Sequence, residues 1–146
     1  MKNLFAALAL IFVAAPSSAE LWSLDYISKV KHLSVMLNDN AKDACWTNLT
    51  ETREYAEEKV RMAGGTLHET GQKYFGEYYD LIVRVNSHRS RSGLCFGSLE
   101  VTLGTAAEIN GERHNANHRS MSTYFGNVQN ANQLIIELVQ SFFESD

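Results

Sequence analysis

The stretch from residue 78 to residue 88 constrains the fold more than any other part of the chain. Its apolar side chains at Tyr79, Leu81 and Val83 alternate with polar ones, a pattern that is typical of a strand with one buried face. Residues 94–103 repeat this alternation after the polar segment SHRSRSG. Two alternating runs separated by a polar turn predict a long antiparallel β-hairpin.

Helical periodicity predicts a helix near each end of the chain. Over residues 21–37, apolar residues recur every three or four positions and form one narrow stripe. Over residues 127–144 the apolar arc is wider and lies opposite a polar stripe, and Asn127 is expected as the N-cap. An arc this wide favours a helix that lies on a sheet; the alternative is a homodimer interface through this C-terminal helix.

Two shorter elements are expected between the first helix and the hairpin. Residues 44–49 predict a short strand. Residues 51–63 predict a helix that begins after Thr50 as the N-cap and ends at Gly64-Gly65.

A last strand is expected over residues 106–109, followed by a turn at Asn110-Gly111 that would place Ile109 opposite Glu112. The expected order of elements is therefore α-β-α-β-β-β-α. It predicts a single α+β domain with an antiparallel sheet of three to four strands and helices packed mainly on one face.

Residues 1–19 have the layout of a secretory signal peptide. Lys2 supplies a positive charge, an apolar run extends from Leu4 to Ala15, and Ser17-Ser18-Ala19 offers a cleavage site. The run is short for a membrane span, and no cysteine that would carry a lipid follows the expected cut. We therefore expect a mature domain of residues 20–146 in the periplasm or secreted.

The charge balance excludes one class of partner. The chain has 13 Lys and Arg against 17 Asp and Glu, a net charge of −4, and removal of the signal peptide takes away a lysine but no acid. An acidic chain is not expected to bind nucleic acid. No second apolar run reaches the length of a transmembrane segment, so none is expected in the mature chain.

Two cysteines, Cys45 and Cys95, lie in the expected mature domain. In an oxidising compartment an even number of cysteines is interpreted first as a disulfide bond. The alternative, a nucleophilic or redox-active cysteine, has no CxxC motif to support it. The sequence therefore predicts a Cys45–Cys95 disulfide.

The histidines at His114 and His118 raise the question of a metal site. Two imidazoles four residues apart share an ion only on a helix, whereas on a strand they lie about 13 Å apart. The preceding Asn-Gly turn favours a strand, with Glu108 expected opposite Arg113. Metal binding by His114 and His118 is therefore not expected, and no cofactor is expected either.

A set of basic residues provides a possible contact patch. Guanidinium groups bind carboxylates and phosphates with two hydrogen bonds, so such a patch would suit an acidic partner. The patch requires the turn of the first hairpin and the Asn-Gly turn to lie at the same end of the sheet; the alternative is a solvated turn. Its members would be Arg84, His88, Arg89, Arg91, Arg113 and Arg119.

No catalytic motif supports an enzyme, since GxSxG, HExxH, P-loop and GxGxxG patterns are all missing from the sequence. The sequence therefore favours an exported, non-enzymatic domain that binds a protein or another envelope component. Two alternatives remain open. One is a small metal-binding or hydrolytic protein that uses His114 and His118, and the other is an inhibitor of an exported enzyme.

Overall fold

The computed structural model describes residues 25–30, 32–68, 79–109 and 112–145. Within these ranges the order of elements is α-β-α-β-β-β-α. The order of element types is the expected one, but two of the strands lie in other segments than expected. The elements are α1 (Asp25–Lys29), β1 (Leu33–Ala41), α2 (Leu49–Met62), β2 (Tyr79–Arg89), β3 (Cys95–Ile109), β4 (Glu112–Val128) and α3 (Asn132–Glu144).

The four strands form one mixed sheet in the order β1-β2-β3-β4. The strands β2, β3 and β4 are antiparallel neighbours, whereas β1 runs parallel to β2 from Leu33 opposite Tyr79 to Ala41 opposite Ser87. The α+β class is confirmed, but the expectation of a purely antiparallel sheet is wrong. Parallel neighbours need a crossover connection, and the connection between β1 and β2 contains α2.

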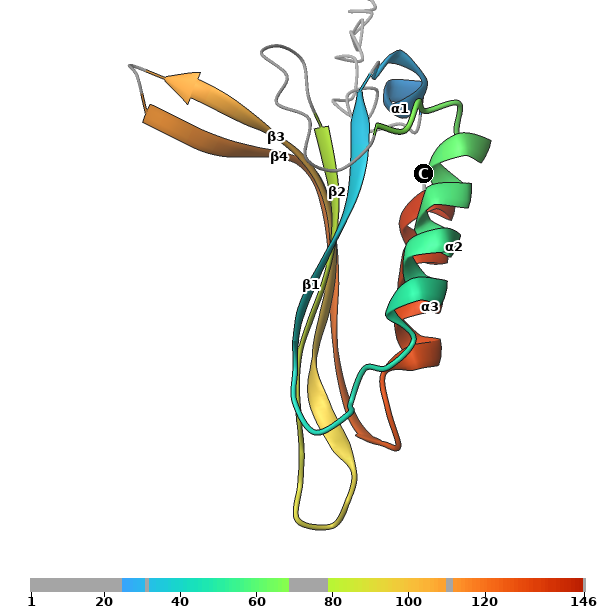
Figure 1. The fold of residues 1–146 in the computed structure, drawn as a ribbon, viewed down its shortest axis with the longest axis vertical. Coiled ribbons are helices and arrows are strands. Elements are labelled where there is room, and N and C mark those ends of the chain that lie inside the picture. Colours follow the sequence, from blue (N-terminus) through green and yellow to red (C-terminus); the bar gives the residue numbers. More distant parts are fainter. Residues whose placement is uncertain (1–24, 31, 69–78, 110–111, 146) are drawn as a thin grey trace, which may run out of the picture.

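The helices α2 and α3 lie side by side on one face of the sheet, and no helix in the described ranges covers the other face (Figure 1). The helices occupy this face because alternate side chains of every strand point toward it and form the core. The strand residues of the core are Leu33, Val35, Leu81, Val83, Val85, Leu99, Val101 and Leu103.

The first part of the described chain departs most from the expectation. The helix expected over residues 21–37 is wrong beyond Lys29, where α1 ends. From Leu33 the chain forms β1, and Leu33 and Val35 are buried beside β2. The apolar residues Leu33, Val35 and Leu37 alternate as in a strand, and contact with β2 decides between the two periodicities.

The strand expected over residues 44–49 is also wrong, because this segment connects β1 to α2 without strand pairing. Cys45 and Trp46 are nevertheless buried in it. The helix α2 is confirmed, although its N-cap is Asn48 rather than Thr50. Gly64, which follows the helix, has a φ of 81°, a left-handed conformation that favours glycine.

The helix α3 is confirmed but begins at Asn132, because β4 continues to Val128. Asn127 has a φ of 60° within this strand and is therefore not the N-cap. The apolar side of α3 packs into the core of its own chain, as expected for a helix that lies on a sheet. Its buried residues are Ile135, Leu138, Val139, Phe142 and Phe143.

The strand expected over residues 106–109 is the end of β3 rather than a separate element. Its expected register is confirmed, with Ile109 opposite Glu112 and Glu108 opposite Arg113. The polar segment that follows Asn110-Gly111 is therefore an extended strand, β4.

The β3–β4 hairpin bends away from the rest of the sheet toward its tip (Figure 1). A register shift lies at Leu103 and Gly104, whose partners are Arg119 and Asn117, so that His118 is an extra residue in β4. Such bulges bend a strand and increase its twist.

Two expectations fall outside the described residues, namely the signal peptide over residues 1–19 and the turn at Asn110-Gly111. Among the helices that the structure does describe, none is both long and apolar enough to cross a membrane.

Candidate functional site

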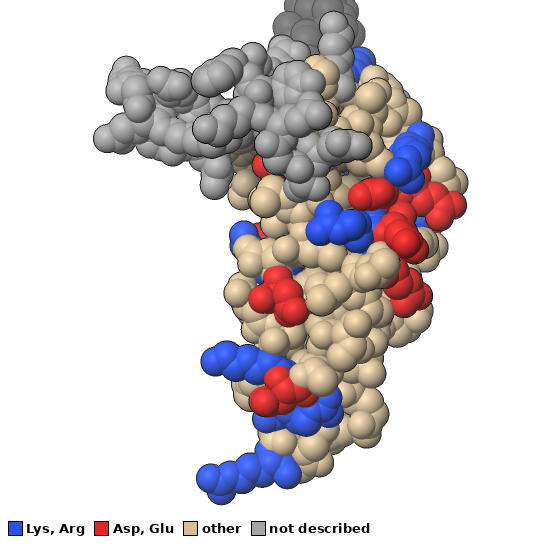
Figure 2. Space-filling model, in the orientation of Figure 1, with Lys and Arg blue, Asp and Glu red and all other residues tan. Residues whose placement is uncertain are grey.

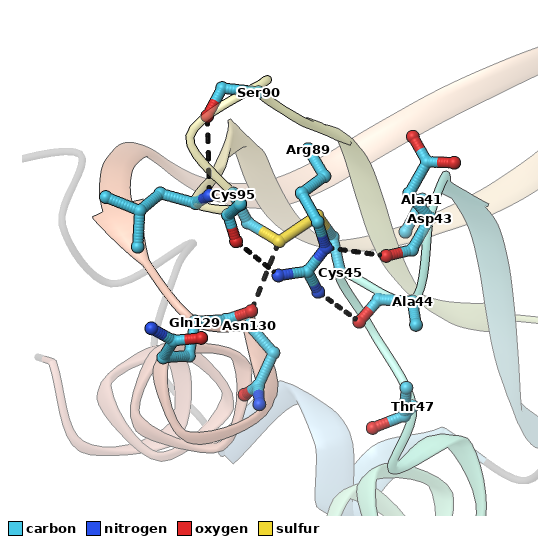
Figure 3. The surroundings of a disulfide bond; sticks show 12 residues. Ala41, Asp43, Ala44, Cys45, Thr47, Arg89, Ser90, Cys95, Gln129 and Asn130 are labelled. Carbon is cyan, nitrogen blue, oxygen red and sulfur yellow. Dashed lines mark hydrogen bonds between the residues drawn. A yellow bond between two sulfur atoms is a disulfide. The ribbon is translucent and has the colours of Figure 1, made fainter.

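The disulfide between Cys45 and Cys95 is confirmed. The two sulfur atoms are 2.02 Å apart, and both residues are fully buried. The bond joins the segment that precedes α2 to the first residue of β3 (Figure 3). It therefore holds the helical layer against the end of the sheet.

A third segment meets the disulfide at the start of α3. The Ala131 amide donates a hydrogen bond of 2.6 Å to the Cys45 carbonyl, and Asn132 Nδ2 donates one of 2.8 Å to Thr47 Oγ1. The Cys95 sulfur lies 3.3 Å from the Gln129 carbonyl, a close contact because a disulfide sulfur has no hydrogen to donate. These contacts indicate a structural role for the cysteines.

Arg89, one of the expected contact residues, binds the backbone of its own chain at this junction (Figure 3). Its guanidinium donates to the carbonyls of Asp43 at 2.9 Å, Ala44 at 3.2 Å and Gly93 at 2.6 Å. Asp43 and Ala44 have φ values of 56° and 57°, which are unfavourable for residues with a side chain. Arg89 therefore stabilises a strained turn.

Arg84 lies on the helix-free face of the sheet and forms an ion pair with Glu100 on β3, with 2.6 Å between Nη1 and Oε2. The Thr102 hydroxyl donates to the other oxygen of Glu100 at 3.1 Å. The Arg84 charge is thus matched by an acid of the neighbouring strand.

Arg119 lies on the opposite face, under α3. Its guanidinium carbon is 5.0 Å from the centroid of the Phe142 ring, and the guanidinium donates to the carbonyl and the hydroxyl of Ser145. This arginine therefore contacts the C-terminal end of α3.

The expected contact patch is not one surface. The strand β3 connects the first hairpin turn, before Cys95, to the second turn, after Ile109, so the two turns lie at opposite ends of the sheet (Figure 1). The expectation that the two turns lie at the same end of the sheet is therefore wrong. Arg91 is exposed in the first turn, His88 is exposed on β2, and the side chain of Arg113 lies outside the described part of the chain.

His114 and His118 both lie on β4. Residues four apart on a strand are about 13 Å apart along the backbone, which does not suit one shared ion. The His118 ring contacts Tyr79, with centroids 5.2 Å apart. No group of three or more possible metal ligands occurs among the side chains that the structure describes.

The helix-free face of the sheet, which we term the open face, carries the most exposed large apolar side chains apart from Met62 on α2. Tyr124 on β4 is 88% exposed, and Met36 on β1 is 42% exposed. On the same face, the His88 and Phe96 rings stack with centroids 6.3 Å apart. The other outward residues of the four strands include Asn38, Asn40, Ile82, Arg84, Asn86, Ser98, Glu100 and Ser122.

Sequence reasoning missed Met36 and Tyr124. Met36 falls in the segment that helical periodicity assigns to a helix, and Tyr124 lies beyond the last expected strand. The alternation of Met121 and Phe125 with small polar residues is the signal that would have placed residues 120–125 in a strand.

Charged side chains are distributed unevenly over the molecule. Acidic and basic side chains are interspersed over α2 in Figure 2, and the end of the molecule away from the grey segments carries mainly Lys and Arg. The exposed Lys42 and Arg91 belong to segments at that end. The helices α2 and α3 carry six glutamates against three basic residues. The open face combines apolar, amide and hydroxyl groups with the Arg84–Glu100 ion pair and the Asp80 carboxylate.

No family model and no curated protein matches the chain. Among solved structures, a minor lipoprotein from Acinetobacter baumannii shares 15% identity over 79% of this chain and 89% of its own, with a TM-score of 0.39. An uncharacterised protein shares 11% identity over 78% of this chain and 86% of its own, with a TM-score of 0.31. Similarities this weak carry no inference about function.

Proposed function

We propose that this protein is an exported, non-enzymatic domain that binds a partner protein through its open face. The observation that carries the proposal is that both long helices cover one face of the sheet, while Tyr124 and Met36 project from the other. A sheet can leave one face in water, and aromatic and methionine side chains exposed on such a face are of the kinds enriched in protein interfaces.

The composition of the open face suits a protein partner. Tyr and Met are enriched in protein interfaces, where an aromatic ring supplies apolar area and its hydroxyl a hydrogen bond. The Asn40 amide donates to Asn86 at 3.0 Å, so polar groups form a rim beside the apolar ones. The Arg84 charge is paired with Glu100, and the Asp80 carboxylate on the same face accepts a hydrogen bond from the Ser34 hydroxyl.

Export is supported by two independent features. Residues 1–19 have the pattern of a signal peptide. The Cys45–Cys95 disulfide is of the kind that persists in oxidising compartments. Cell fractionation with N-terminal sequencing tests this part: we expect periplasmic or secreted protein beginning at Glu20. Protein that remains in the cytoplasm with its first residues intact would contradict export.

Binding is tested by placing a photoreactive amino acid at Met36 in the full chain and irradiating intact cells. We expect one discrete adduct with a partner protein. The matched control is the same replacement at Met62, an exposed methionine on α2 that lies outside the open face and is 73% exposed. Equal adducts at both positions, or none at Met36, would contradict the proposal.

The metal-binding alternative is tested by metal analysis of the purified protein. We expect no stoichiometric zinc or copper. A bound metal that is lost in the His114→Ala variant would contradict the proposal and favour the metal-binding alternative.

A further inference from the structure

The outer edge of β4 is a long strand edge that no other strand of the described residues pairs with. β4 is an edge strand because the sheet order ends with it. Over residues 120–128 it contains no Asp, Glu, Lys, Arg or Pro. Those are the residues with which proteins keep strand edges from pairing with other chains.

The first part of the opposite edge of the sheet is covered by the chain itself. Leu33 on β1 forms a parallel bridge with Leu67, and the His68 amide donates to the Leu33 carbonyl at 2.8 Å. Arg53 on α2 donates to the Val35 carbonyl at 2.7 Å. The chain therefore satisfies the outward carbonyls of Leu33 and Val35 at the start of β1, and β4 has no such cover among the described residues.

The β4 edge also leaves apolar surface half-covered. Met121 and Phe125 pack against the core from the helical side of the sheet but stay partly exposed. Tyr124 projects from the open face and is 88% exposed. A strand added beside β4 would cover side chains on both faces at once.

The distribution of charge favours the β4 strand of a second copy of this chain as the added strand. The chain has a net charge of −4, and α2 and α3 together carry six glutamates against three basic residues, Arg53, Lys59 and Arg61, so two copies repel each other over the helical side. Residues 120–136 form the longest run without a charged residue after residue 20. Two copies that meet along this run place no like charges opposite each other.

We propose that two copies pair their β4 strands antiparallel about a two-fold axis at Thr123, so that one sheet continues through both. In this register Met121 of each copy faces Phe125 of the other, a sulfur–aromatic contact on the helical side. On the open face, Ser122 of each copy faces Tyr124 of the other. Every contact occurs twice because the interface is isologous. The proposal goes beyond the proposed function, which requires no dimer.

The test introduces a charged side chain at the residue on the two-fold axis. Thr123 is exposed, so Thr123→Lys and Thr123→Glu are compatible with the fold. In a dimer of either variant, two like charges face each other at position 123, which weakens association by about tenfold. In an equimolar mixture of the two variants, opposite charges face each other, and association is restored. Sedimentation equilibrium of the oxidised protein over a wide concentration range measures the dissociation constants. The matched controls are Thr50→Lys and Thr50→Glu on the exposed side of α2, which leave the dimer unchanged.

Three results would overturn the proposal: a parent protein that stays monomeric at every concentration, a dimer that persists in both variants, and variants that dissociate but do not recover on mixing. Thermal unfolding identifies any variant that fails to fold. In that case Tyr124→Ser replaces it, because this side chain is almost fully exposed, and it weakens the dimer too. A monomer that still gives the Met36 adduct refutes the dimer and leaves the proposed function standing.

Discussion

The guanidinium carbon of Arg119 on β4 lies 5.0 Å from the centroid of the Phe142 ring on α3. The same guanidinium donates to the carbonyl of Ser145, the C-cap of α3, and to its hydroxyl at 2.6 Å. A cation is favourable at this end of a helix because the last carbonyls carry partial negative charge. A side chain that the sequence suggests as an external contact therefore holds the last helix to the sheet.

Replacing Arg119 is expected to destabilise the protein. Arg119→Ala removes the ring contact and the hydrogen bonds to Ser145, and lowers the free energy of unfolding by about 1–2 kcal/mol. Arg119→Lys keeps the charge but not the planar fork, and recovers part of this loss. Urea unfolding of the oxidised protein measures both. The control is Arg91→Ala in the exposed turn, and an equal effect of the two alanine variants would contradict the role of Arg119.

Removing the disulfide is expected to cost about 4 kcal/mol, because the bond closes a loop with a sequence separation of 50. The double variant Cys45→Ala and Cys95→Ala shows this loss in urea unfolding. Hydrogen exchange adds a local signal, since the Ala131 amide donates to the Cys45 carbonyl and should lose protection before the centre of β2. Unchanged exchange at Ala131 would contradict the coupling between the disulfide and α3.

Ala44→Gly is expected to stabilise the protein by about 1 kcal/mol. Ala44 has a φ of 57°, and glycine adopts this conformation without the steric strain of a Cβ. The matched control is Ala63→Gly, where φ is −77°. There glycine relieves no strain and lowers stability, because it adds conformational freedom to the unfolded chain. Thermal or urea unfolding compares the two. If Ala44→Gly destabilises as much as Ala63→Gly, the left-handed turn is not strained.

Gly97→Ala is expected to destabilise by about 3 kcal/mol or more. A Cβ at Gly97 would lie 2.1 Å from the Asn86 carbonyl on β2, and backbone atoms of a sheet cannot move away without breaking its pairing. Gly93→Ala is the control, because its φ of 85° is unfavourable but no atom lies within 4 Å. We expect about 1 kcal/mol there. Urea unfolding that ranks Gly93→Ala as the more harmful change would refute the packing argument.

The parts of the fold that could be predicted from sequence are those whose signals are local. The alternation around Leu81 and Leu99 defines β2 and the first half of β3, and the wide apolar arc before Phe142 defines α3. A strand that pairs with its neighbour through a short turn needs no information from elsewhere. The disulfide followed from the count of two cysteines.

The misassigned segment shows where local signals fail. Leu33 and Leu37 satisfy the spacing of a helix, while Leu33, Val35 and Leu37 satisfy that of a strand. The choice depends on β2, which begins at Tyr79 and pairs with β1 in parallel. A contact across this separation leaves no mark within residues 33–41 themselves.

The candidate site was less accessible than the fold. Whether an arginine contacts solvent, an acid or a carbonyl depends on partners that are distant in sequence, such as Asp43 for Arg89 and Ser145 for Arg119. The open face has no sequence motif, because the exposure of Met36 and Tyr124 depends on how other segments pack and not on the residues around them in the sequence.

The sequence by itself determined the α+β class, the central hairpin, both long helices and the cysteine pair, because each depends on periodicity or count within a short segment. Only the tertiary structure decided that residues 33–41 form a parallel strand, that β4 extends to Val128, and that the predicted arginine patch is divided between the two ends and faces of the sheet. The physical reason is that strand pairing and burial are satisfied between segments, and one segment alone does not specify its partner.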